Sequence, residues 1–204
     1  MNGTEFIAKI LKAEGIDNIT CFPSNPLIEA AAKEGIRTIA FRHERGAVMA
    51  ADGYSRTSQG KRFGVALVQS QAGAENAMGG ISQAFADNIP ILVMPGGISL
   101  DQLGVKPNFS ALQKYQGWVK QVESILSPND VGNVMRRAFN ALRNGPPGPV
   151  VVEMTSDVCS LEIPKSFENY HSPKSAKIIP SQNDISDAVK LLMKAKKPLI
   201  WAGG

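Results

Sequence analysis

Short apolar runs alternate along this chain with longer segments in which apolar residues recur every three or four positions. The runs 63–68 and 89–94 are almost continuously apolar, which is typical of strands covered on both faces of a sheet. The longer segments have the spacing of helices that bury one face. The pattern predicts strands at 16–22, 36–41, 63–68, 89–94, 150–154 and 198–202, and helices at 27–33, 44–59, 73–87 and 184–194.

Two further helices are marked by signals at their ends. Thr4 can cap a first helix that Gly15 ends. Ser127-Pro128 is typical of a helix start, and the Gly-Pro-Pro-Gly-Pro run at 145–149 breaks the helix that follows it. The pattern assigns no element to 98–126. Strands that alternate with helices predict an α/β fold with a doubly wound, mostly parallel sheet and helices on both faces.

The same pattern divides the chain into three parts. Residues 1–160 carry the alternating elements of one α/β domain. From 161 to 183 the chain becomes polar and is dotted with prolines, which predicts a linker. The predicted helix and strand within 184–204 indicate the start of a second, truncated α/β domain.

Composition excludes several classes of protein. Hydrophobic residues make up 43% of the 204 residues and charged residues 20%, which is ordinary for a globular protein and argues against disorder. The net charge of +4 is small and dispersed, so we expect no nucleic-acid partner. Cys21 and Cys159 form no CxxC pair and are expected to be small buried hydrophobes in a reducing compartment. The chain shows neither a leader pattern nor an apolar run of membrane-spanning length, so we expect a cytoplasmic protein without a membrane partner.

One carboxylate stands out because of its position. Glu44 lies where the predicted strand 36–41 gives way to the alanine-rich helix 44–59. In open α/β sheets ligands bind beyond the carboxyl ends of the strands, so this side chain can meet a cofactor. The alternative is a structural Glu, placed in the first turn of a helix because the positive end of the helix dipole favours it.

A second segment follows the strand 63–68 directly. Residues 70–80 contain a glycine-bearing turn that opens a helix, an arrangement that can bind phosphate. The segment has neither a GxGxxG pattern nor a P-loop lysine, which weakens that interpretation. Close packing through Gly73, Gly79 and Gly80 is the structural alternative.

Several segments, taken in order, carry a resemblance to a known family. The stretch 41–56 resembles the glutamate segment of thiamine-diphosphate-dependent enzymes, and 73–76 resembles their Gly-Ala-x-Asn turn. Ala86-Asp87-Asn88-Ile89-Pro90 is similar to their Ala-x-x-Asp-x-x-Pro pattern. Residues 145–152 resemble their Gly-Pro-x-x-Val strand, and 195–204 resemble the opening of their central domain. The overall resemblance is to the acetolactate-synthase-like and benzoylformate-decarboxylase-like branch, and it covers essentially the whole chain.

The resemblance implies a role for Glu44. In this family a glutamate carboxyl hydrogen-bonds N1′ of the cofactor's aminopyrimidine ring and so favours the imino form, whose 4′-nitrogen takes the proton from C2. By the same resemblance we expect Glu44 to activate thiamine diphosphate. The loop Pro23-Ser24-Asn25 resembles a turn that lines the site in relatives, although a plain proline turn is an equal alternative. The other expected cofactor contacts are Gln69, Gly73 and Asn76.

The implied reaction is decarboxylation or carboligation of a 2-oxo acid, with two departures from the family pattern. Gln69 stands where some decarboxylases carry a histidine, and an amide cannot do that histidine's acid–base work. Phe109-Ser110 lies where synthases often carry Phe-Gln. His43 and His171 have no ligand-like company, so no metal site is expected in this chain.

Half of the family's cofactor site is missing from this sequence. The family holds Mg²⁺ and the diphosphate through a Gly-Asp-Gly segment on a separate domain, and no Gly-Asp-Gly occurs here. We therefore expect a homo-oligomer, dimer or tetramer, that works with a diphosphate-binding domain of the same or a partner chain. Whether a central domain would bind FAD stays open.

Two alternatives to an enzyme half-site remain at this point. One is a non-catalytic association module that keeps the fold. The other is an unrelated nucleotide-binding domain, which the lack of a glycine-rich phosphate fingerprint disfavours.

Overall fold

A six-stranded sheet organises the computed structural model, which describes residues 1–58 and 61–202. All strand pairs are parallel, in the order β2-β1-β3-β4-β6-β5. The predicted α/β fold with a parallel sheet is thus confirmed. The strands are β1 (Asn18–Cys21), β2 (Arg37–Ala40), β3 (Gly64–Val68), β4 (Ile91–Gly97), β5 (Gln121–Ile125) and β6 (Val150–Thr155).

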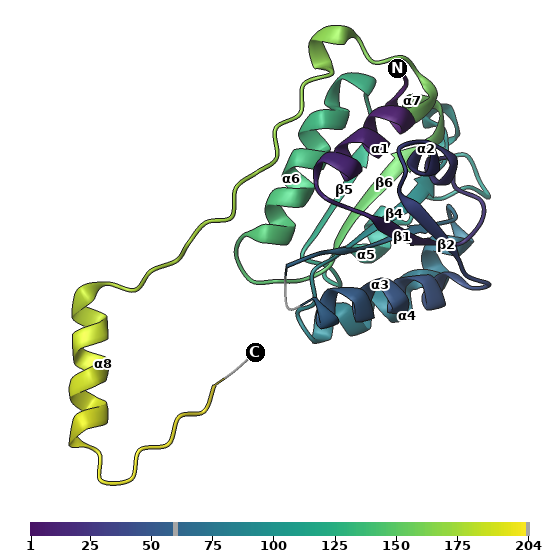
Figure 1. Ribbon diagram of the computed structural model, residues 1–204. Coiled ribbons are helices and arrows are strands. Elements are labelled where there is room, and N and C mark those ends of the chain that lie inside the picture. Colours follow the sequence, from purple (N-terminus) through teal and green to yellow (C-terminus); the bar gives the residue numbers. More distant parts are fainter. Residues whose placement is uncertain (59–60, 203–204) are drawn as a thin grey trace.

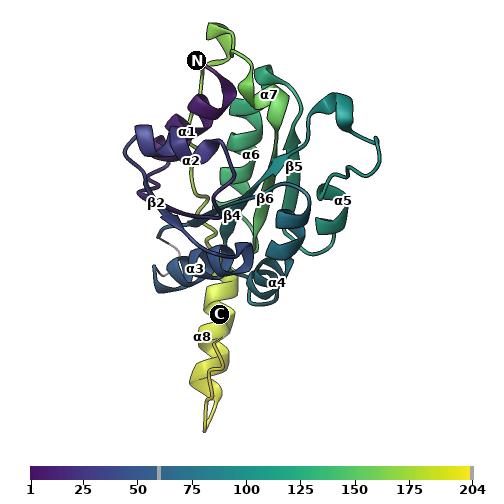
Figure 2. The ribbon, with the colours of Figure 1, turned by 90° about the vertical axis from the view of Figure 1, so that its right-hand side faces the viewer.

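Helices cover both faces of this sheet (Figures 1 and 2). On one face α1, α2, α6 and α7 pack with the sheet into the larger apolar core, and on the other face α3, α4 and α5 form the smaller core. The α-helices are α1 (Gly3–Ala13), α2 (Leu27–Lys33), α3 (Glu44–Thr57), α4 (Ala72–Ala86), α5 (Leu112–Tyr115), α6 (Val131–Arg143), α7 (Ser156–Ser160) and α8 (Gln182–Lys194). Three short 3₁₀ turns are η1 (Leu100–Gln102), η2 (Pro128–Asp130) and η3 (Lys165–Phe167).

The central strands follow the apolar pattern closely. Every residue of β3 and β6 is buried, as expected for parallel strands covered on both faces. Both cysteines are buried and free, which confirms that they act as small apolar residues. No helix among residues 1–58 and 61–202 is long and apolar enough to cross a lipid bilayer.

One predicted strand boundary is wrong, one strand is missing from the prediction, and one predicted strand does not form. The strand expected to stop before Pro95 continues as β4 to Gly97, because the pairing with β6 goes on through Gly96 and Gly97. The edge strand β5 was not predicted, because most of its residues are only half-buried and give no apolar run. Residues 198–202 form no strand, since no described segment lies beside them to share a ladder of hydrogen bonds.

The first helix begins differently from the prediction. Asn2, not Thr4, is its N-cap, and a capping box joins Asn2 to Glu5. Thr4 is buried instead, and its hydroxyl donates to the carbonyl of Cys159 at 3.1 Å. The helix expected from Ser127 starts as the capped turn η2 and continues as α6.

The predicted linker runs along the domain before it leaves it. Asn2 forms a β-bridge with Glu162, and the backbone N–H of Ala176 donates to the Asn144 side chain at 2.6 Å. Beyond this point α8 buries none of its residues and lies away from the sheet in Figure 1. The division at 160 and 183 stays a prediction.

Candidate functional site

The carboxyl ends of the parallel strands bring together the segments that the sequence singles out. Glu44 begins α3 just after β2, and the 69–73 turn follows β3. The loop 23–26 follows β1, the strand between them in the sheet. These segments therefore meet at the carboxyl end of the strands, here called the carboxyl edge of the sheet, where open α/β folds bind ligands.

Glu44 is a buried carboxylate with only one polar side-chain partner among the described residues. It is 3% exposed. The Asn76 side chain in α4 donates its amide N–H to Glu44 Oε2 at 3.3 Å. Within residues 1–58 and 61–202 no salt bridge neutralises Glu44, and its Oε1 accepts no side-chain hydrogen bond. Glu44 is the first residue of α3, so the positive end of the helix dipole stabilises its negative charge instead.

Gly73 leaves room for this carboxylate. A Cβ atom at Gly73 would lie 2.8 Å from Glu44 Oε1 and 2.4 Å from the Cβ atom of Gln69. Any side chain at this position would therefore cover Oε1 of Glu44 and collide with Gln69, the residue after β3. Gly80, two turns further along the same face of α4, lets that helix approach Val48 of α3, where an added Cβ atom would meet a methyl carbon at 2.9 Å. The glycines thus serve close packing, as the structural alternative expected, and one of them also shapes the surroundings of Glu44.

Asn25 has its polar atoms occupied by the fold. The side chain is buried, its Nδ2 donates to the carbonyls of Val68 at 3.1 Å and Met94 at 3.2 Å, and its Oδ1 accepts from the N–H of Leu27 at 3.1 Å. It therefore ties the β1 loop to the ends of β3 and β4. Among its neighbours, Ser24 is exposed and lines a hollow of about 160 Å³ together with Ser70 and Gly96.

The remaining predicted residues lie at the rim. Pro23 and Gln69 are exposed, and Gln69 is the residue whose stem faces Gly73 beside Glu44. The structure thus brings Glu44, Gln69, Gly73 and Asn76 together, and the loop 23–25 follows β1, the strand between β2 and β3 in the sheet.

Sequence reasoning missed a second buried carboxylate at this edge. Glu153 in β6 is 5% exposed and accepts hydrogen bonds from the hydroxyls of Ser110 at 3.0 Å and Ser124 at 2.8 Å. The signal was present, because Glu153 is the one charged residue in the otherwise apolar run 150–154. It is held by β5 and by the segment after β4, both of which the pattern left unassigned.

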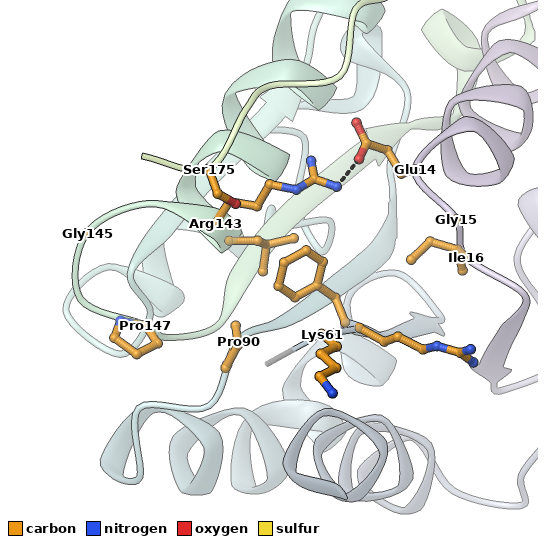
Figure 3. Close-up of a pocket in the computed structure, with 12 residues that line it drawn as sticks. Glu14, Gly15, Ile16, Lys61, Pro90, Arg143, Gly145, Pro147 and Ser175 are labelled. Carbon is orange, nitrogen blue, oxygen red and sulfur yellow. Dashed lines mark hydrogen bonds and ion pairs between the residues drawn. The ribbon is translucent and has the colours of Figure 1, made fainter. Parts of the chain in front are cut away.

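The opposite end of the sheet holds a different hollow, of about 480 Å³ (Figure 3). Its walls come from the loops that enter the strands, and its charged centre is Glu14 with Arg143. The Glu14 carboxylate also accepts from the hydroxyl of Tyr170, which belongs to the predicted linker. Nη2 of Arg143 pairs with Glu14, whereas its buried Nη1 has no hydrogen-bond partner among the described residues. Because the ion pair and Tyr170 join α1, α6 and the 161–183 segment, we interpret this group as structural.

No group of three His, Cys, Asp or Glu side chains in the described part of the chain could hold a metal ion. The site at the carboxyl edge therefore consists of a buried carboxyl, an amide that holds it and a glycine that leaves it open.

Residues 1–124 match the family described as "Thiamine pyrophosphate enzyme, N-terminal TPP binding domain". Thiamine pyrophosphate (TPP) is the cofactor called thiamine diphosphate above. The match includes the segments around Glu44, Gly73 and Asn76.

Relatives match the whole chain but are much longer. The chain is 33% identical to the acetolactate synthase large subunit of Buchnera aphidicola subsp. Schizaphis graminum and covers 37% of its length. It is 30% identical to the acetolactate synthase large subunit of Lactococcus lactis and covers 36% of it. Against the acetolactate synthase isozyme 2 large subunit of Escherichia coli the identity is 28% and the cover 37%. The chain thus spans just over a third of these relatives, and by its match over residues 1–124 it belongs to the thiamine pyrophosphate enzymes, whose N-terminal TPP-binding domain it contains.

Proposed function

We propose that this chain is the N-terminal part of a thiamine-diphosphate-dependent enzyme that acts on 2-oxo acids, in the manner of the acetolactate synthases it is similar to. Glu44 is the residue that activates the cofactor. One observation carries the proposal: Glu44 is a buried carboxylate at the ligand-binding edge of the sheet with no cation partner among the described residues.

The surroundings of Glu44 fit an aminopyrimidine ring. A buried carboxylate without a cation is costly unless a hydrogen-bonding partner meets it. Asn76 satisfies Oε2, whereas Gly73 leaves Oε1 uncovered on the side where any other residue would place a Cβ atom. Oε1 is therefore the atom that can share a proton with a ring nitrogen.

Each residue at this edge of the sheet has a separate role toward the cofactor. Thiamine diphosphate, when bound, supplies an electron sink for the carbon that loses carbon dioxide. Glu44 holds or gives up a proton at the ring, and Asn76 fixes the rotamer of its carboxyl. Gln69 lies at the rim beside Glu44 and can offer an amide to a ligand. Ser24 and Pro23 border the same edge from the β1 loop.

The other half of the site has to come from a diphosphate-binding domain of the same or a partner chain. A diphosphate held through Mg²⁺ needs oxygen ligands in a near-octahedral shell. The described residues contain no acidic cluster of that kind. We expect the working enzyme to be a homo-oligomer, since symmetric assemblies are the rule for soluble oligomers.

The test is hydrogen–deuterium exchange at C2 of thiamine diphosphate, followed by NMR, in the enzyme assembled with its diphosphate-binding domain. Glu44→Gln should slow the exchange by orders of magnitude, because the amide cannot share the carboxyl proton. Glu29→Gln is the matched control, since Glu29 is exposed on α2 and pairs only with Lys33. An unchanged exchange rate in Glu44→Gln would remove Glu44 from the chemistry and favour a module that works by association alone.

A further inference from the structure

The turn between β3 and α4 has a backbone that glycine normally adopts, yet it carries a glutamine. Gln71 has φ 51° and ψ −108°. The carbonyl of Ser70 accepts from the N–H of Gly73 at 3.1 Å across the turn. A four-residue turn with positive φ at its first central position is of type II′, and glycine is the usual residue there because a Cβ atom is strained.

The side chain of Gln71 reaches out of this turn to another segment. Its Nε2 donates to Oδ1 of Asn108 at 3.3 Å. The Nδ2 of Asn108 in turn donates to Oε1 of Gln102 at 3.4 Å. The residues 98–111, here called the 98–111 loop, connect β4 to α5 and contain η1. Gln71 is therefore the first link of an amide ladder that joins the start of α4 to this loop.

The 98–111 loop builds a hollow of its own. Together with the start of α5 it surrounds about 580 Å³, a volume in the range of small-ligand sites. Polar and aromatic side chains line it, including Lys106, Asn108, Phe109, Ser110 and Lys114. The hydroxyl of Ser110 also donates to the buried Glu153, so a shift of the loop would disturb a hydrogen bond of β6.

The same helical turn thus serves two parts of the molecule. Gly73 and Asn76, in the first turns of α4, meet Glu44 on the α3 side. Gln71, at the N-cap of the same helix, meets the 98–111 loop. Gln71 thus joins the 98–111 loop to the helix whose first turns contact Glu44.

We propose that Gln71 is a positioning residue: its side chain docks the 98–111 loop on the start of α4, and the strained backbone at Gln71 is the cost of that contact. Strain of this kind persists where surrounding structure holds it, and it clusters at functional sites. The docking of the loop does not depend on the proposed function.

The experiment uses the 204-residue chain and separates strain from side-chain contact with two variants. Gln71→Ala removes the amide but keeps the Cβ atom and hence the strain. Gln71→Gly removes both. Hydrogen exchange of peptides from the 98–111 loop, read by mass spectrometry, reports docking, and thermal melting reports stability. Peptides from β3 and β4 serve as the internal control.

Both variants should speed exchange in the 98–111 loop by about fivefold, the effect of losing one ordinary hydrogen bond, while β3 and β4 exchange as before. Gln71→Gly should nevertheless melt about 2–4 °C above Gln71→Ala, because relief of strain outweighs the extra freedom of glycine in the unfolded chain. Asn108→Ala should speed exchange in the loop at least as much, because it removes the contacts with both Gln71 and Gln102. Adding Gln71→Ala to Asn108→Ala should change the loop no further.

Two results would overturn the proposal. Unchanged exchange in the loop of either Gln71 variant would show that the side chain does not dock it. A Gln71→Gly chain that melts at or below Gln71→Ala would show that the turn carries no strain. Neither readout involves cofactor or turnover, so a failure of the proposed enzyme function leaves the result interpretable.

Discussion

The amide of Asn76 donates to the carboxylate of Glu44 at 3.3 Å, which joins α4 to the first residue of α3. Glu44 is buried, whereas Asn76 is exposed, so the contact fixes the rotamer of the carboxyl and also satisfies a buried acceptor. Variants of this pair therefore need one measurement of chemistry and one of stability.

Asn76→Ala should lower the rate of C2 exchange in the assembled enzyme by about tenfold, since a loose carboxyl spends less time in the productive position. The free energy of unfolding should fall by about 1–3 kcal/mol, because the buried carboxyl of Glu44 loses its one side-chain hydrogen bond among the described residues. Gln83→Ala, another exposed amide on α4, is the matched control and should change neither quantity. Equal rates in the two variants would mean that Asn76 does not orient Glu44.

Gly73→Ala should destabilise the domain by about 1–3 kcal/mol, because its new Cβ atom would lie 2.4 Å from the Cβ atom of Gln69. The control is Gly53→Ala in α3, where an added Cβ atom meets nothing within 4 Å. That change should stabilise the chain by about 0.5–1 kcal/mol, since alanine is the better helix former. Urea unfolding of both variants measures the difference, and changes of the same sign would contradict the packing described for Gly73.

The ion pair of Arg143 with Glu14 should matter far more than a surface pair. The Glu14 side chain is 0% exposed and that of Arg143 17%. Arg143→Met would leave a buried carboxylate without its cation, which costs about 3–5 kcal/mol. Lys33→Met, which removes an exposed pair with Glu29, should leave the free energy of unfolding almost unchanged. Chemical denaturation measures both, and a similar loss in the two variants would contradict the structural role of Arg143.

Patterning predicted the central strands because these strands are buried on both faces and therefore read as apolar runs. It could not find β5, whose glutamine, glutamate and serine positions are half-buried at the sheet edge. It also ended β4 at Pro95, although that strand keeps its pairing with Val68 and then with β6. A proline removes one backbone N–H donor from the hydrogen bonds between strands. The strand continues because the residues before and after it still pair with neighbouring strands.

The candidate site, too, could be predicted only in part from the sequence. Glu44 could be predicted because strand, carboxylate and helix follow one another directly in the sequence. Glu153 with Ser110 could not, because the contact joins residues 43 positions apart. The strained backbone at Gln71 also has no signature in the sequence, since a glutamine before Ala-Gly predicts no particular turn.

Alkaline pH should weaken the fold through Cys159. Burial raises the pKa of this thiol to about 12 from an ordinary value of 9.0. The folded thiol stays neutral while the unfolded chain ionises above about pH 9, so stability is full below pH 9 and is lost as the pH rises toward 12. The loss contributed by this group should approach about 1.4 kcal/mol per pH unit above pH 9. Unfolding free energies at pH 8 and pH 10 should therefore differ less in Cys159→Ala than in the unchanged chain; an identical difference would contradict the assignment.

Residues 1–204 alone should bind thiamine diphosphate weakly or not at all. Glu44 and its neighbours can meet the aminopyrimidine ring, but the diphosphate needs Mg²⁺ in a shell of oxygen ligands. Among the described residues no acidic cluster supplies that shell. Even the best small ligands gain at most about 1.5 kcal/mol per atom, and a ring bound at a half-open edge gains much less. Calorimetry with cofactor and Mg²⁺ should therefore detect no micromolar binding to this chain, whereas adding the diphosphate-binding domain should produce Mg²⁺-dependent binding that Glu44→Ala weakens. Micromolar binding to residues 1–204 alone would mean that the diphosphate half of the site lies within this chain after all.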